Sequence, residues 1–144
     1  MEEGEREGAE RLVRRACAWV ARNPGTWERL RGICRALMRS GHVIQRDNVY
    51  TLACQAGMDV SEASEFRRDH NLWSVLSRYM VLLEPPMLAA VGFRRATVDG
   101  VDLVAAWEEL VGPAGFAASS LAEAQAICVA GAQEIRIERN FVRG

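Results

Sequence analysis

The sequence predicts a mainly α-helical, compact domain with a minor sheet of two or three short strands. The chain has 144 residues, a length typical of one domain, and no internal repeat or linker divides it. Apolar residues make up 49% and charged residues 26% of the chain, a balance that favours a globular fold over disorder. Apolar positions recur three and four residues apart through most of the chain, as they do in amphipathic helices.

Two amphipathic helices are predicted near the N-terminus, at residues 8–22 and 27–40. Each has apolar residues on one face and arginines on the other. Thr26 is expected to cap the second helix, and Gly41 is expected to end it in the left-handed conformation. Residues 1–8 are expected to form a flexible acidic tail of the single domain, which spans the whole chain.

Further helices and a few short strands are predicted along the rest of the chain. Asp47 is expected to cap the third helix, and Ser120 with Glu123 matches a capping box at the start of the last one. Helices are predicted at 48–56, from Ser61 to about residue 68, and at 71–83, 85–92, 103–111 and 120–130. Short strands are predicted at 42–44, 93–98 and 134–139.

The predicted helix at 71–83 is apolar on most sides, which indicates a central place in the core. Trp73 is expected to be among the most buried residues of the protein. The one polar stripe of this helix consists of Asn71, Ser74, Ser77 and Arg78.

Residues 48–68 carry the spacing of a helix-turn-helix unit. Such units have a small residue in the first helix, a glycine in the turn, and apolar residues at set intervals after it. Ala53, Gly57, Met58 and Phe66 occupy these positions. The stretch therefore resembles a helix-turn-helix, and the predicted strands around it would suit a winged-helix domain. The resemblance implies that the second helix contacts DNA.

The charge of that second helix departs from the family pattern. A recognition helix enters a DNA groove with its N-terminal end, close to the phosphates. Here that end carries Asp59, Glu62 and Glu65, with no basic residue before Arg67. Small Ala63 also stands where an apolar residue is usual. The alternative interpretation is a structural corner between two helices rather than a reader of bases.

Arginine supplies all 18 basic residues, and the chain contains no lysine. Mechanisms that need lysine, such as the phosphate-binding loop and Schiff-base catalysis, are therefore excluded. Nine of the arginines lie in residues 11–46, against a single glutamate. A GC-rich genome is the alternative reason for the missing lysine, because lysine codons are AT-rich.

This arginine-rich part predicts a binding surface for phosphate groups or for an acidic protein. The candidates lie on the polar faces of the first two helices and in two later arginine pairs. They are Arg11, Arg14, Arg15, Arg22, Arg31, Arg35, Arg39, Arg67, Arg68, Arg94 and Arg95. The alternative is a solvated face whose charges pair with the acidic residues at 1–10 or at 99–123.

The sequence contains no recognisable catalytic or metal-binding motif. Its four cysteines form no CxxC pair, and their spacing to the two histidines matches no zinc site. We therefore expect a protein that is not an enzyme, with reduced thiols and with no cofactor, metal or catalytic residue.

Together these observations predict a regulatory or accessory domain that binds nucleic acid through an arginine-rich helical face. The alternative is a protein-binding module that docks on an acidic partner surface. In size, charge segregation and lack of lysine, the chain is similar in general kind to small phage and mobile-element proteins, including anti-CRISPR inhibitors of host defence. An acidic start and the absence of a long apolar run predict a cytoplasmic protein without membrane contact.

Overall fold

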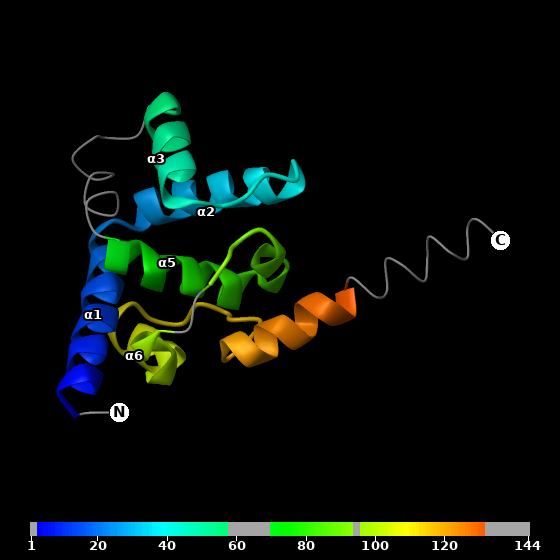
Figure 1. Ribbon diagram of the computed structural model, residues 1–144. Helices are drawn as coiled ribbons and strands as arrows, with labels where there is room; N and C mark the ends of the chain where they lie inside the picture. Colours follow the sequence, from blue (N-terminus) through cyan, green and yellow to red (C-terminus); the bar gives the residue numbers. More distant parts are fainter. Residues whose placement is uncertain (1–2, 58–69, 94–95, 132–144) are drawn as a thin grey trace.

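The computed structural model describes residues 3–57, 70–93 and 96–131, and helices make up most of these ranges (Figure 1). The prediction of a mainly helical protein is therefore confirmed. No helix in these ranges combines the length and the apolar character that a bilayer span requires.

The same ranges contain no strand, so the predicted minor sheet is not found there. Residues 42–44 form a loop instead, and the Ile44 N–H donates a hydrogen bond to the Ala90 carbonyl (2.9 Å). Thr97–Gly100 forms a short 3-10 helix, η2, where the second strand is predicted to end. A strand needs a neighbouring strand to satisfy its backbone groups, and neither segment has one among the described residues. The predicted strand at 134–139 lies outside the described residues.

The first helix, α1 (Glu3–Arg22), begins well before residue 8. Residues 3–8, where the sequence predicts a flexible tail, are therefore helical. Glu3 and Glu5 in the first turn favour this early start, because negative charges interact well with the positive end of a helix dipole.

The second helix, α2 (Pro24–Arg39), also starts earlier than predicted. Proline fits the first helical turn, where its missing N–H would have no partner inside the helix. Thr26 consequently lies buried inside α2 instead of capping it. Gly41 has a φ of 74°, the left-handed conformation predicted to end this helix.

The third helix, α3 (Arg46–Gln55), is the first helix of the stretch that resembles a helix-turn-helix. It begins at Arg46, so Asp47 lies inside its first turn and does not cap it; the Asp47 carboxylate lies 3.4 Å from Arg46 Nε. Gly57 has a φ of 85° and ends the helix as predicted. The second helix of the resemblance, with its acidic end, falls in 58–69, outside the described residues.

The helix α5 (His70–Leu83) lies beside α1 in the middle of the molecule and leads into a 3-10 helix, η1 (Pro85–Ala89) (Figure 1). Its predicted central place is confirmed, because Leu76, Tyr79 and Leu82 are fully buried. The Leu82 carbonyl also accepts hydrogen bonds from the backbone N–H groups of Ala117 and Ala118.

One prediction about α5 is wrong, and its polar stripe is more buried than the stripe's composition indicates. Trp73 is only partly buried and lies at the edge of a shallow cavity of about 430 Å³. Arg78, on the polar stripe, is 2% exposed, and Ser77 is also buried. The reason is that η2 and Phe93 cover the polar side of the helix, as the Arg78 contacts described below show.

The helix α6 (Leu103–Leu110) closes the core against α1. Its Trp107 is the centre of an aromatic cluster, with ring centroids 5.6 Å from Trp27, 4.8 Å from Tyr79 and 5.6 Å from Phe116. These residues come from distant parts of the sequence. The cluster therefore joins α2, α5 and α6 to one another and to the segment that follows α6.

The last described helix covers residues 121–131 and begins with the predicted cap. The Ser120 hydroxyl oxygen accepts a hydrogen bond from the Glu123 N–H (3.2 Å). The Glu123 carboxylate accepts hydrogen bonds from the N–H (3.3 Å) and the hydroxyl (2.6 Å) of Ser119. In a standard capping box it would accept from the N–H of Ser120 instead. These bonds hold the pKa of Glu123 below its ordinary value.

Candidate functional site

Three exposed arginines form a row along α1. At about 100° per residue, Arg11, Arg15 and Arg22 fall within about 40° of one another around the helix, and they span about 16 Å along it. All three are exposed. They face outward because the opposite face of α1, which includes Val13 and Val20, is buried in the core. We call Arg11, Arg15 and Arg22 the arginine row.

Arg14 lies beside this row and pairs with an acidic residue. Its two terminal guanidinium nitrogens each donate to one carboxylate oxygen of Glu109 on α6, both at 3.2 Å. This hydrogen-bonded pairing raises the pKa of Arg14. The expected alternative, pairing with the acidic 99–123 region, therefore holds for this residue.

Arg31 and Arg35 of α2 are also occupied. Both donate to the carboxylate of Glu84, which lies between α5 and η1: Arg31 Nη2 at 3.3 Å, and Arg35 through Nε (3.1 Å) and Nη2. Arg31 Nη1 also donates to Glu28 (3.1 Å). The pKa of Glu84 lies below its ordinary value, mainly because Arg35 donates hydrogen bonds to the carboxylate. The predicted stripe of Arg31, Arg35 and Arg39 is thus not one solvated face.

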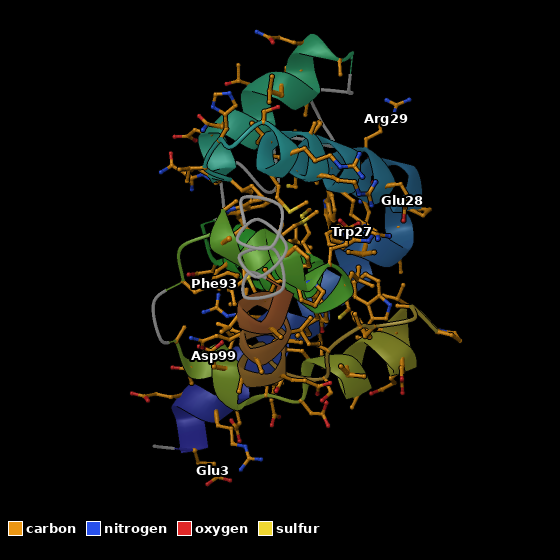
Figure 2. All side chains as sticks on the ribbon, turned by 90° about the vertical axis from the view of Figure 1, so that its right-hand side faces the viewer. Glu3, Trp27, Glu28, Arg29, Phe93 and Asp99 are labelled. Carbon is orange, nitrogen blue, oxygen red and sulfur yellow. The ribbon has the colours of Figure 1, made fainter. Side chains whose placement is uncertain are left out.

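Two further arginines of α2 are exposed. Arg39 is a predicted candidate, whereas Arg29 is missed by sequence reasoning because it lies off the stripe. Figure 2 shows the Arg29 side chain extending outward from α2, at the opposite end of the molecule from Glu3. The acidic start of α1 therefore lies far from Arg29.

Four exposed arginines differ from Arg14, Arg31 and Arg35 in their partners. Within residues 3–57, 70–93 and 96–131, no ion pair or hydrogen bond joins the side chains of Arg11, Arg22, Arg29 or Arg39 to another residue. Their guanidinium groups are consequently available to an external anion. The candidates Arg67, Arg68, Arg94 and Arg95 lie outside the described residues.

Among the residues that the structure describes, Arg78 is the most deeply buried charged residue. Its Nε donates to Asp99 Oδ1 (2.7 Å), its Nη2 to Asp99 Oδ2 (3.3 Å), and its Nη1 to the Ser74 carbonyl (2.9 Å). The guanidinium carbon also lies 4.8 Å from the ring centroid of Phe93 (Figure 2 labels Phe93 and Asp99). Arg78 therefore attaches η2 to α5 and does not contribute to a binding surface.

Two of the cysteine thiols lie in the core. Cys17 and Cys34 are buried, and burial raises the pKa of Cys34 to about 12. The Cys17 sulfur lies 3.2 Å from the Tyr79 hydroxyl, which donates to the Leu103 carbonyl (2.7 Å). In the part of the chain that the structure describes, no three His, Cys, Asp or Glu side chains are grouped as a metal site would need.

No family model, curated protein or solved structure matches this chain. Its function is therefore inferred from the geometry and charge of its own residues.

Proposed function

We propose that this protein is an accessory or regulatory domain that binds nucleic acid through phosphate contacts made by its exposed arginines. Arg11 and Arg22 of the arginine row are the main contacts, and Arg29 and Arg39 of α2 add to them. The observation that carries the proposal is the division among the arginines. Some are joined to carboxylates of the chain itself, whereas Arg11 and Arg22 on the outward face of α1 have no such partner among the described residues.

The arginine row suits a phosphate backbone in spacing and chemistry. Its length of about 16 Å corresponds to roughly five phosphates of one strand, measured along a duplex axis. A guanidinium group donates two parallel hydrogen bonds to a phosphate, which a lysine ammonium cannot do. Like charges four residues apart repel mildly, and a bound phosphate would remove that cost.

Binding of this kind would depend on charge and only weakly on base sequence. The affinity expected for non-specific contacts is about 1–100 μM at physiological salt, and it falls steeply as the salt concentration rises. The test is fluorescence anisotropy with a labelled random duplex and a labelled single strand, each titrated at several salt concentrations between about 50 and 200 mM.

The variant Arg11→Gln/Arg22→Gln should weaken binding and reduce the slope of log affinity against log salt by about two, one unit for each lost phosphate contact. The matched control is Arg6→Gln/Arg14→Gln. It removes two exposed arginines from the same helix, but these already pair with Glu10 (3.5 Å) and Glu109 (3.2 Å). The control should therefore change the slope much less, although the net charge changes equally.

Absence of measurable affinity for either nucleic acid at about 50 mM salt would overturn the proposal. Equal effects of the two double variants would overturn the assignment of the contact to the arginine row. The first of these results would favour the remaining candidate, in which the same arginines dock on an acidic protein surface.

A further inference from the structure

A cavity of about 380 Å³ lies where the ends of several helices meet. Its lining includes Val20 of α1, Trp27 of α2, Leu83 of α5 and Trp107 of α6 (Figure 2 labels Trp27). Most of the lining side chains are apolar. A cavity of this size and character suits a small molecule that is itself largely apolar.

Two side chains of this cavity carry N–H groups without an acceptor. The indole Nε1 of Trp107 and the guanidinium Nε of Arg31 are both buried, and neither has a hydrogen-bond partner in the part of the chain that the structure describes. Trp107 as a whole is only 3% exposed. Buried donors are nearly always paired in proteins, because an unpaired donor loses its bonds to water and gains none in return. The cavity therefore lacks an acceptor that these two donors would bind.

The loop at 113–116 forms the wall of the cavity that is held least firmly. Its first two residues line the cavity. Backbone hydrogen bonds fix the chain on either side of it, from the Gly112 N–H to the Trp107 carbonyl (3.0 Å) and from the Ala117 N–H to the Leu82 carbonyl (3.0 Å). Within the described ranges, residues 113–116 make no backbone hydrogen bond of their own. An entering molecule can therefore displace this wall more easily than the helices around it and reach the shielded donors.

We propose that this cavity binds a small, uncharged, largely apolar molecule through a carbonyl group. The carbonyl oxygen accepts a hydrogen bond from the Trp107 indole N–H, and the Arg31 Nε–H is a second donor. An uncharged ligand fits best because the charge of Arg31 is already balanced: its terminal nitrogens donate to Glu28 (3.1 Å) and Glu84 (3.3 Å). Glu28 also lines the cavity, so a carboxylate ligand would meet a like charge there.

Nuclear magnetic resonance of the full, nitrogen-15-labelled chain tests this proposal with two probes, acetophenone and ethylbenzene. The two molecules have the same ring and nearly the same shape, but only acetophenone has a carbonyl oxygen. The chain has four tryptophans, each of which gives one indole N–H signal. The variants Trp107→Phe and Trp73→Phe identify two of these signals, because each variant lacks one.

Acetophenone, titrated to about 1 mM, should move the Trp107 indole signal to higher frequency than ethylbenzene does, because the N–H gains a hydrogen bond. The Trp73 indole signal is the internal control. Trp73 lies at a different cavity, so neither probe should move its signal.

The affinities of the two probes provide a second measurement, followed through the backbone signals of the residues around the cavity. Trp107→Phe keeps an aromatic ring but removes the N–H. It should raise the dissociation constant of acetophenone about tenfold and that of ethylbenzene less than about threefold, because only acetophenone loses a hydrogen bond. The matched control Trp73→Phe should change neither affinity. Circular dichroism checks that both variants fold, and the signals of the wild-type chain decide the question without them.

The proposal is wrong if neither probe moves a signal of the cavity residues at about 1 mM. It is also wrong if acetophenone and ethylbenzene shift the Trp107 indole signal equally, or if Trp107→Phe weakens both probes equally. Equal shifts would mean that the indole N–H faces a ring of the aromatic cluster, such as that of Phe116, and not a ligand. The experiment contains no nucleic acid and changes no residue of the arginine row, so its outcome is independent of the proposed function.

Discussion

At the residue scale, Arg78 shows how a charged side chain becomes part of the core. It is 2% exposed, and Asp99, Ser74 and the ring of Phe93 surround its guanidinium group. The Asp99 carboxylate in turn accepts a hydrogen bond from the Ala96 N–H (3.0 Å), so one ion pair organises the start of η2. The contribution of Arg78 is structural.

The substitution Arg78→Ala should lower the free energy of unfolding by about 3 kcal/mol, because it removes the ion pair with Asp99 and empties a packed position. Urea denaturation followed by circular dichroism measures the change. The control Arg6→Ala, at an exposed site, should stay within about 0.5 kcal/mol of the wild type. A loss below about 1 kcal/mol for Arg78→Ala would show that the ion pair contributes little.

Glu84 gives a prediction about pH. The hydrogen bonds from Arg35 hold its pKa in the folded protein below the ordinary value of 4.5. The stabilisation from the ionised carboxylate is therefore complete above pH 4.5 and is lost as the pH falls through the lowered folded pKa. The stability difference between the wild type and Glu84→Gln should shrink from pH 6 to pH 3 in urea titrations.

The variant Arg35→Gln tests whether Arg35 is the cause of the lowered Glu84 pKa. It removes the main hydrogen-bond donor to Glu84. In the Arg35→Gln background, the substitution Glu84→Gln should therefore cost less stability at pH 6 than it does in the wild type. A difference between wild type and Glu84→Gln that stays constant from pH 6 to pH 3 would contradict the assignment.

At the scale of the elements, the helices meet around the aromatic cluster of Trp107. α5 supplies Tyr79 to this cluster, whereas the Trp73 side chain of the same helix lies at the edge of a cavity. Two tryptophans that look alike in the sequence therefore have different roles. Trp107 joins several helices, whereas Trp73 lies at the margin of the core.

This difference is measurable. Trp107→Ala should lower the free energy of unfolding by about 3–5 kcal/mol, as is typical for a fully packed aromatic side chain. Trp73→Ala should cost about 1–2 kcal/mol, because the solvent already reaches part of its surface. Urea denaturation of both variants under the same conditions decides the order, and equal costs would contradict the placement of Trp73.

At the scale of the whole molecule, the opposite charges of the sequence are partly joined by the fold. Arg14 and Glu109 lie 95 positions apart in the sequence and form a two-pronged ion pair between α1 and α6. Glu84 joins two arginines of α2 to the end of α5. The basic charge that remains on the outside is concentrated on the outward side of α1 and on α2, where phosphate binding is proposed.

The sequence by itself determined the helical class and the approximate place of most described helices. Helix formation depends on residues three and four positions apart, so the apolar spacing at 71–83 and the glycines at 41 and 57 were sufficient. The charge segregation and the exposed positions of Arg11, Arg22 and Arg39 also followed from the polar faces of the first two helices.

Only the tertiary structure decided the contacts between distant segments. A short alternating segment becomes a strand only beside another strand, and the residues at 42–44 have a single distant backbone hydrogen bond instead. The helical stripe of Arg31 and Arg35 could not reveal that Glu84 would lie next to it. The polar side of α5 likewise gave no sign that η2 would cover Arg78. Local spacing determines which side of a helix a residue occupies, but the packing of other elements determines what that side meets.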